Sequence, residues 1–370
     1  MELELLKKLV EIESYVDRIK NKSEITITKT IVDFFSSKLP FYKVTRIKVE
    51  NSRENLLILP RNPKIIFCCH LDTVLPSKKN HNKLTIKEDK AFGLGTKDMK
   101  GGWVSSLLSV IELSQTNREK VGFLFYCDEE YGQKGMETML SNISKIPRSV
   151  KYFICPESRF NLTFGCRGYS TIRVTIHGLR AHTSRPQQGV NSGEIIFNVY
   201  KGLQKRLKAK TRLGDNTISL TGLKVGVLVD GVCKDTDNSI PDYAEANFSI
   251  RLSKAISKNE LNKKIVNVIK KNHKLGFDVK IEQLRLPSSI ISSIDLRKFI
   301  NSAKKAGYKI KLADPGLSGY NDVAMISSKT GIPFLGFGPY GEGNHGPNEW
   351  VSLKSIKDTK EIFKKFIENI

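Results

Sequence analysis

Short hydrophobic runs alternate with amphipathic segments over the first half of the chain. The runs "ENLLILP", "KIIFCCH", "VGFLFYCDEE" and "KYFICPE" span residues 54–60, 64–70, 121–130 and 151–157, and such runs are typical of strands buried on both faces of a sheet. Residues 99–115 carry hydrophobic side chains at helical spacing, and residues 1–16 have an amphipathic helical stripe. This alternation predicts an α/β domain built on a mainly parallel sheet.

The pattern changes after Cys166. In "YSTIRVTIHG", residues 169–178, hydrophobic and polar side chains alternate, as in a strand with one solvated face. A helix near 191–209, two strands, a helix near 257–273 and a last strand follow, which is the order of a ferredoxin-like βαββαβ unit. We therefore expect an inserted α+β domain at 167–285, with 1–166 and 286–370 together forming the first domain.

Metal-ligand side chains follow three of the hydrophobic runs. The run "KIIFCC" is followed by His70 and Asp72, "VGFLFYC" by Asp128, Glu129 and Glu130, and "KYFICP" by Glu157. Parallel strands present their carboxyl ends at one edge of a sheet, and ligands bind in the crevice there. These acids and the histidine are therefore expected to converge.

Two further candidates lie in glycine-rich segments. Asp98 stands in "FGLGTKDMKGG", where a dinucleotide-binding loop would need glycine, and an acid at that position repels phosphate and attracts a cation. His345 lies in "GPYGEGNHGPNEWV", after the hydrophobic run "GIPFLGFG". Histidine and carboxylates without cysteine indicate zinc, cobalt or manganese, and five candidate ligands suit two ions bridged by a carboxylate.

In this order, "CCHLDTVLP", "GLGTKDMKGG", "CDEEYGQKG", "CPES" and "GNHGPNEW" resemble the motifs of the M20 family of di-zinc metallopeptidases and amidohydrolases. That family includes acetylornithine deacetylase and succinyl-diaminopimelate desuccinylase. The inserted domain also resembles the lid or dimerisation domain of the family, in "GLRAHTSRPQQGVNSGE" and "NSIPDYAEANFSIRL". Nearly the whole chain is covered.

The resemblance implies a role for each matching residue. One zinc ion would be held by His70, Asp98 and Glu157, and the other by Asp98, Glu130 and His345, with Asp98 bridging. Glu129 would be the general base, and Asp72 would orient the imidazole of His70.

The resemblance also implies roles for residues of the inserted domain. His182 would reach the active site of a partner subunit and stabilise the oxyanion, and Asn238 would assist it. Arg251 would bind a substrate carboxylate. In "GLSGYNDVAMI", Asp322 resembles a substrate-contacting position of the family, whereas Tyr320 and Asn321 depart from its pattern.

Composition narrows the class of protein. The six cysteines form no C-x-x-C pair, so a thiolate zinc site has no support.

The net charge of +23 would suit a nucleic-acid binder, but the basic residues are scattered over helical faces without an arginine-rich arm or an aromatic stacking motif. The simplest interpretation is that these lysines lie on solvent-exposed faces of helices. The positive charge can also attract an anionic small molecule or an acidic protein. We expect no nucleic-acid partner.

No hydrophobic run approaches the ~20 residues of a membrane span, and the amino terminus lacks the features of a signal peptide. Together with the resemblance to the M20 family, the sequence predicts a cytoplasmic hydrolase with two divalent ions, Zn²⁺ in the first place and Co²⁺ or Mn²⁺ as alternatives. The resemblance also implies a homodimer formed through the inserted domain. The hydrolase would cleave the amide bond of an N-acyl amino acid, as a deacetylase or desuccinylase does. A carboxypeptidase or dipeptidase of the same family is the alternative within the enzyme class, and a non-catalytic binding protein on the same fold is the alternative outside it.

Overall fold

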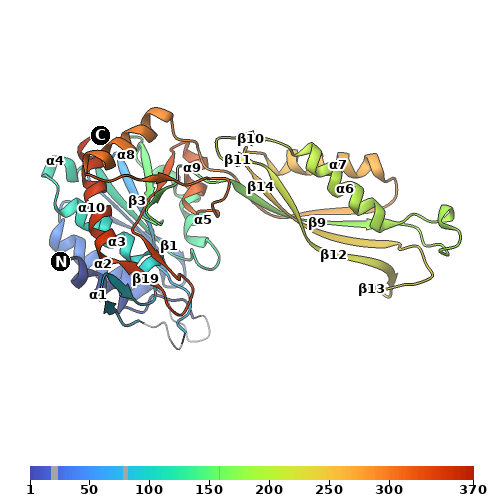
Figure 1. The fold of residues 1–370 in the computed structure, drawn as a ribbon, viewed down its shortest axis with the longest axis horizontal. Coiled ribbons are helices and arrows are strands. Elements are labelled where there is room, and N and C mark those ends of the chain that lie inside the picture. Colours follow the sequence, from blue (N-terminus) through green and yellow to red (C-terminus); the bar gives the residue numbers. More distant parts are fainter. Residues whose placement is uncertain (18–23, 78–81, 158) are drawn as a thin grey trace. The chain divides into compact units, whose positions relative to one another are not determined.

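Two structural units make up the chain in the computed structural model, which describes residues 1–17, 24–77, 82–157 and 159–370 (Figure 1). The first unit comprises Met1–Gly165, Ser288–Asp314 and Asn321–Ile370, and the second comprises Cys166–Pro287 and Pro315–Tyr320. The inserted domain was predicted at 167–285. The stretch Pro315–Tyr320 belongs with the second unit although the chain around it belongs to the first, which the hydrophobic pattern did not indicate.

A six-stranded sheet forms the centre of the first unit, with strand order β1-β2-β6-β3-β7-β17. Strands β6, β3, β7 and β17 are parallel, whereas β2 and β1 are antiparallel to their neighbours. The bounds are β1 Lys43–Glu50, β2 Arg53–Leu59, β3 Ile65–His70, β6 Val121–Tyr126, β7 Tyr152–Cys155 and β17 Phe334–Gly336. Strands β3, β6 and β7 are buried at every residue, which agrees with their uninterrupted hydrophobic sequences.

Aromatic contacts join three helices to this sheet. The helices of the first unit are α1 Glu2–Val10, α2 Ile25–Lys38, α3 Gly101–Ile111, α4 Gln115–Arg118, α5 Lys134–Ser141, α8 Ser293–Lys305, α9 Val323–Thr330 and α10 Leu353–Glu368. Phe35 of α2 and Trp103 of α3 both pack edge-on against Phe125, and Phe363 of α10 packs against Phe67. These large rings hold the helices against the strands that lead to the candidate site.

The first helix is shorter than predicted. The amphipathic stripe indicated a helix over residues 1–16, but α1 ends at Val10, and Tyr15 then pairs with Thr73 in an isolated bridge. The backbone N–H of Thr73 donates to the carbonyl of Ser14 at 3.2 Å. This contact takes the chain away from helical geometry, because it uses backbone groups that a continuing helix would occupy.

A second sheet of the first unit has the order β18-β19-β5-β4, with β4 Thr85–Lys87, β5 Lys90–Phe92, β18 Gly341–Glu342 and β19 Trp350–Ser352. The residues between β18 and β19 include His345. The short strands β8 Asn161–Leu162 and β16 Lys311–Leu312 form a parallel pair.

The second unit has the predicted order of elements. Strand β9 Gly168–His177 is followed by α6 Ser192–Arg206, β12 Thr217–Val229, β14 Tyr243–Leu252, α7 Lys258–Asn272 and β15 Phe277–Arg285. The antiparallel sheet runs β13-β12-β14-β9-β15, with β13 Val232–Lys234 at its edge and β10 Lys210–Thr211 paired with β11 Gly214–Asp215. Without β13, this is the strand order of a ferredoxin-like fold. The α/β fold class is confirmed.

Helices α6 and α7 carry the hydrophobic side of this unit. Leu203 and Ile265 are fully buried with Val174 and Phe248 of the sheet. Among the described residues, no helix is both long enough and apolar enough to cross a bilayer.

Candidate active site

Side chains at the carboxyl ends of three neighbouring strands form the candidate site. His70 is the last residue of β3, Glu129 and Glu130 follow β6, and Glu157 follows β7. Strand β3 is parallel to both neighbours, with His70 opposite Tyr126 and Phe67 opposite Ile154. The three strands therefore end at the same edge of the sheet, as the sequence predicted.

Asp98 lies between the two imidazoles. Its Oδ1 is 2.8 Å from His70 Nε2, and its Oδ2 is 3.4 Å from His345 Nε2. The same nitrogen of His345 is 2.9 Å from Glu130 Oε2. Each oxygen of this carboxylate thus faces a different histidine, which is the arrangement of a carboxylate that bridges two cations.

Two groups of potential ligands share Asp98. The ligand atoms of His70, Asp98 and Glu157 lie within 4.8 Å of one another, and so do those of Asp98, Glu130 and His345. Imidazole nitrogens and carboxylate oxygens, without thiolates, suit zinc, cobalt or manganese. The donor set therefore fits two divalent ions with a shared carboxylate.

Asp72 contacts the two glutamates. Its carboxylate accepts hydrogen bonds from the backbone N–H groups of Glu129 at 3.1 Å and Glu130 at 3.0 Å. The Nδ1 atom of His70 lies 2.9 Å from the backbone carbonyl of Asp72 and 3.9 Å from its carboxylate. In this structure the main chain of Asp72 makes the hydrogen bond to the imidazole, and its side chain holds the loop that carries Glu129 and Glu130.

Asp98 and His70 shift each other's pKa in opposite directions. Burial opposes the ionised form of Asp98, but hydrogen bonds from His345 and His70 hold its pKa well below the usual value. Burial likewise opposes protonation of His70, and the hydrogen bond to Asp98 raises its pKa well above normal. The site is thus arranged so that Asp98 stays ionised beside positive charge.

The adjacent glutamates differ from Asp98. Burial raises the pKa of Glu129 well above its usual value, and the nearby carboxylates of Asp322 and Asp98 add to this. Burial also raises the pKa of Glu130, to about 7. A carboxyl group with a raised pKa can accept and return a proton near neutral pH.

Glu349 is a site residue that the sequence reasoning did not identify. Its buried carboxylate accepts hydrogen bonds from the backbone N–H groups of Gly95 at 2.9 Å, Lys97 at 2.9 Å and Asp98 at 3.0 Å. It therefore holds the turn Thr96–Lys100 that presents Asp98. Its place four residues after His345, in "NHGPNEW", was the available signal, but nothing in the sequence indicated its backbone partners.

Strand β2 contributes two more residues that were missed. Asn55 accepts a hydrogen bond from the N–H of Cys127 at 3.1 Å and donates to the carbonyl of Gly135 at 2.8 Å. Arg53, two residues earlier, lies 2.8 Å from Asp128. Polar residues at alternate positions of an apolar strand were the signal, because they point to the same face.

The three candidates of the inserted domain all lie in the second unit. His182 is exposed, and its Nδ1 lies 2.8 Å from the hydroxyl of Ser184. The carbonyl of Asn238 accepts a hydrogen bond from Thr183 N at 3.1 Å, so His182 and Asn238 belong to neighbouring segments. Arg251 on β14 is half-buried, with its guanidinium 5.6 Å from the ring centre of Tyr169.

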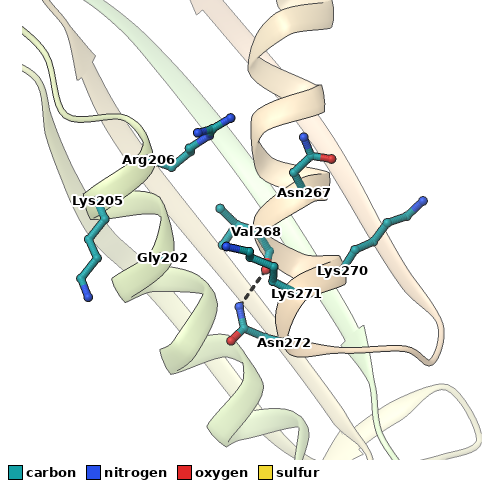
Figure 2. Close-up of a pocket in the computed structure, with 8 residues that line it drawn as sticks. All are labelled: Gly202, Lys205, Arg206, Asn267, Val268, Lys270, Lys271 and Asn272. Carbon is teal, nitrogen blue, oxygen red and sulfur yellow. Dashed lines mark hydrogen bonds between the residues drawn. The ribbon is translucent and has the colours of Figure 1, made fainter.

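A cavity of about 730 Å³ lies between α6 and α7, on the same unit (Figure 2). Gly202 allows the close packing of the two helices there, because a Cβ atom at this position would lie 2.5 Å from Val268. The charged residues that line it are all basic: Lys205, Arg206, Lys270 and Lys271. None of the predicted site residues lines this cavity. The candidate site is therefore identified by its group of histidine and carboxylate side chains and not by the size of a cavity.

Curated relatives of the chain are succinyl-diaminopimelate desuccinylases. The protein of that name from Rickettsia bellii is 26% identical over 329 residues, which is 82% of this chain and 81% of the relative. The one from Rickettsia massiliae is 26% identical over 326 residues, covering 83% of this chain and 84% of the relative.

Solved structures with the same fold span the whole chain. The aminopeptidase PepT from Bacillus cereus matches with a TM-score of 0.75 at 19% identity, covering 100% of this chain and 97% of that one. An M20 family metallo-carboxypeptidase from Sulfolobus solfataricus matches with a TM-score of 0.70 at 15% identity, covering 100% and 98%. At these identities the likeness concerns the fold alone.

The model of peptidase family M20/M25/M40 matches residues 66–369. This span contains the strand-end acids, both histidines of the cluster and the inserted domain. The resemblance inferred from the motifs is therefore confirmed: the chain is a hydrolytic enzyme that belongs to peptidase family M20/M25/M40.

Proposed function

We propose that this enzyme is a metal-dependent deacylase that hydrolyses the amide bond of an N-acyl amino acid, as deacetylases and desuccinylases do. The observation that carries the proposal is the pair of ligand groups that share Asp98, with Glu129 beside them. The curated relatives support this reaction class, because their name describes removal of a succinyl group and they align over four-fifths of the chain.

One divalent ion would be held by His70, Asp98 and Glu157, and the other by Asp98, Glu130 and His345. Zinc is our first choice, and cobalt or manganese would fit the same nitrogen and oxygen donors. A solved relative from Bacillus subtilis, with a TM-score of 0.65, is described as a dinuclear metal-binding peptidase. Such ions supply Lewis-acid polarisation of the scissile carbonyl and a more acidic water.

Glu129 is the general base in this proposal. It lies in the loop that follows β6, and its backbone N–H is held by Asp72. Its raised pKa suits a group that takes a proton from the attacking water and returns it to the departing nitrogen. Glu130, the next residue, is already 2.9 Å from His345 and acts as a ligand. The two adjacent carboxylates thus divide the roles of base and ligand.

The second unit would complete the site. We assign His182 to stabilisation of the oxyanion in a partner subunit, with Asn238 assisting, and Arg251 to the carboxylate of the substrate. This assignment requires a homodimer formed through the second unit. The substrate would be a small N-acyl amino acid met in the cytoplasm, with neither nucleic acid nor a membrane as partner.

A carboxypeptidase or dipeptidase reaction is the alternative that uses the same residues. Structural relatives from Sulfolobus solfataricus and Saccharomyces cerevisiae are described as a carboxypeptidase and a dipeptidase, with TM-scores of 0.70 and 0.63. The two reactions use the same residues to cleave an amide bond. They differ in the substrate, which carries an acyl group on the amide in one case and an amino-acid residue in the other.

The proposal is tested by stripping the protein with a chelator, reloading it with zinc, cobalt or manganese, and measuring hydrolysis of N-acetyl amino acids, N-succinyl amino acids and dipeptides. We expect metal-dependent turnover that is highest for an N-acyl amino acid. A higher rate with a dipeptide would favour the dipeptidase or carboxypeptidase reaction over the deacylase reaction. Binding of these substrates without hydrolysis would favour a non-catalytic binding protein on the same fold. Gel filtration coupled to light scattering tests the dimer, and His182→Ala should then lower kcat without loss of metal.

A further inference from the structure

A buried ion-pair cluster joins strand β2 to the loop that carries Glu129 and Glu130. The guanidinium of Arg53 donates from Nε to Glu24 at 3.0 Å and from Nη1 to Asp128 at 2.8 Å. Glu24 and Asp128 are both fully buried, and Arg53 is 6% exposed. Burying charges at this depth lowers the folding stability unless each charge is closely paired. Such a cluster beside the loop of Glu129 and Glu130 therefore suggests a role in holding that loop.

Asp128 is the residue through which this cluster reaches the site. It directly precedes Glu129, and its backbone has φ of 68°, which is uncommon for a residue other than glycine. Its carbonyl accepts the backbone N–H groups of Gly132 at 3.3 Å and Gln133 at 2.6 Å, and its carboxylate accepts that of Lys134 at 3.2 Å. The conformation of Asp128 therefore determines how the chain leaves β6 and where the side chain of the next residue, Glu129, points.

Arg53 stands in register with this residue. Leu56 pairs with Phe125 and Ile58 with Phe123 in the antiparallel ladder of β2 and β6, so continuing the ladder places Arg53 opposite Asp128. Asn55, on the same face of β2, holds the backbone of Cys127 and Gly135 on either side of the loop. Strand β2 thus contacts the loop at both of its ends.

A second contact closes the cluster into a ring. Arg53 Nη1 also donates to Glu50 at 3.0 Å, and the other oxygen of Glu50 pairs with the ammonium of Lys134. Lys134 is the residue whose backbone N–H contacts Asp128. The loop is consequently held on one side by Asp72, through the N–H groups of Glu129 and Glu130, and on the other side by Arg53.

We propose that Arg53 is a positioning residue for the hydrolytic reaction: by holding Asp128 in its left-handed conformation, it keeps Glu129 directed at the reacting atoms. The inference rests on the proposed function, in which Glu129 is the base. Arg53 itself contacts no residue of the metal-ligand groups in any hydrogen bond or ion pair that the described residues make with it. Glu130 has contacts of its own, from its backbone N–H to the Asp72 carboxylate and from its side chain to His345. The effect of Arg53 is therefore expected on the rate of the chemical step, through Glu129, with the binding of metal and substrate retained.

The test compares Arg53→Met and Asp128→Asn with the control Glu24→Gln. Glu24 is the other buried carboxylate on the same guanidinium, but it belongs to the residue before α2 and not to the loop. We expect Arg53→Met and Asp128→Asn each to lower kcat by about tenfold to a hundredfold, because small displacements of a catalytic group have effects of this size. KM should stay within about twofold and the metal content should not change.

The control and the double variant distinguish positioning from stability. Glu24→Gln should lower the unfolding temperature while kcat stays within about twofold of the wild type. The double variant Arg53→Met/Asp128→Asn should be no slower than the slower single variant, because both changes break one linkage. An equal loss of kcat in Glu24→Gln, or a wild-type kcat in Asp128→Asn, would overturn the proposal. Asp128→Asn keeps the size of the side chain and provides the test alone if Arg53→Met does not fold.

Amide hydrogen exchange gives a measurement that does not depend on activity. Exchange in residues 129–134 should accelerate by about tenfold or more in Arg53→Met and Asp128→Asn, but not in Glu24→Gln. Unchanged exchange of the loop in both variants would refute the inference even if the wild type hydrolysed no substrate offered. Failure of the proposed function would appear instead as an inactive, metal-loaded wild type whose loop still responds to these substitutions.

Discussion

The two adjacent glutamates, to which we assign different roles, have different neighbours. Glu130 Oε2 lies 2.9 Å from His345, whereas Glu129 is half-buried, and desolvation together with the nearby carboxylates of Asp322 and Asp98 raises its pKa. The sequence placed both at the end of a strand, and the resemblance to the family assigned base and ligand. The contact to His345 is what the structure adds to that assignment.

Glu129→Gln tests the base directly. The amide keeps the size of the side chain but cannot accept the proton of water, so kcat should fall by about a hundredfold to ten-thousandfold. Metal content, measured by atomic absorption, should remain that of the wild type. Turnover near the wild-type rate would remove Glu129 as the base.

The pH dependence of stability without metal follows from Glu130 and His345. Burial raises the pKa of Glu130 from 4.5 to about 7, and the hydrogen bond to Asp98 raises that of His345 from 6.5 to about 9. A pKa that is higher in the folded state stabilises below the unfolded-state value, and that contribution is lost as the pH rises through the folded-state value. The chelated protein should therefore lose stability between about pH 5 and pH 9.

Metal should reverse this trend, because Glu130 and His345, as the proposed ligands, would bind it in their deprotonated forms. The rise in unfolding temperature on addition of zinc should be larger at pH 8 than at pH 6, as measured by thermal unfolding with chelator or with metal. An equal rise at both values would contradict the assignment of Glu130 and His345 as ligands. His345→Ala should reduce the difference.

At the scale of elements, the proposed ligands Asp98 and Glu157 lie in turns that pack on one another. Helix α3 begins at Gly101, just after the turn that presents Asp98, and Gly102 lies against Pro156, the residue before Glu157. A Cβ atom at Gly102 would lie 1.8 Å from the carbonyl oxygen of Pro156. Two ligand-bearing segments thus meet at a residue with no side chain.

Gly102→Ala should consequently lower both stability and metal affinity. Overpacking of this kind typically costs about 1–3 kcal/mol of unfolding free energy, and here it also displaces the segment of Glu157. Gly319→Ala is the matched control, because nothing lies within 4 Å of a Cβ atom there. Thermal unfolding and zinc titration should separate the two variants, and equal behaviour would show that the turns can move apart without cost.

The elements also show which parts of the fold the hydrophobic pattern could predict. Buried strands such as β3 and β6 were predicted because hydrophobic residues at every position leave no solvated face. Strand β1 was missed, since "KVTRIKVE" has only Ile47 fully buried and lies at the edge of the sheet. The end of α1 was misplaced because a backbone contact between Ser14 and Thr73, distant in sequence, replaces helical hydrogen bonds.

For the whole molecule, the net charge of +23 has a kinetic consequence. A positively charged protein raises the encounter rate of an anionic substrate, and salt screens this attraction over about 10 Å at 0.1 M. If turnover is limited by encounter, kcat/KM for an N-succinyl amino acid should fall as ionic strength rises from about 0.05 to about 0.5 M. A zwitterionic dipeptide is the control and should respond less. If kcat/KM fell equally with salt for the two substrates, the net charge of the protein would not be what speeds the encounter with the anionic one.

The sequence by itself determined the residue types of the site, their place at the ends of buried strands and the order of elements in the second unit. These follow from local rules: hydrophobic runs become buried strands, and parallel strands end at one edge. Only the tertiary structure decided that Glu349 holds the turn of Asp98, that the side chain of Asp72 holds the glutamate loop, and that Arg53 holds Asp128. Each of these contacts joins segments distant in sequence through a backbone N–H group or a buried charge, and the residue types along the chain do not specify such partners.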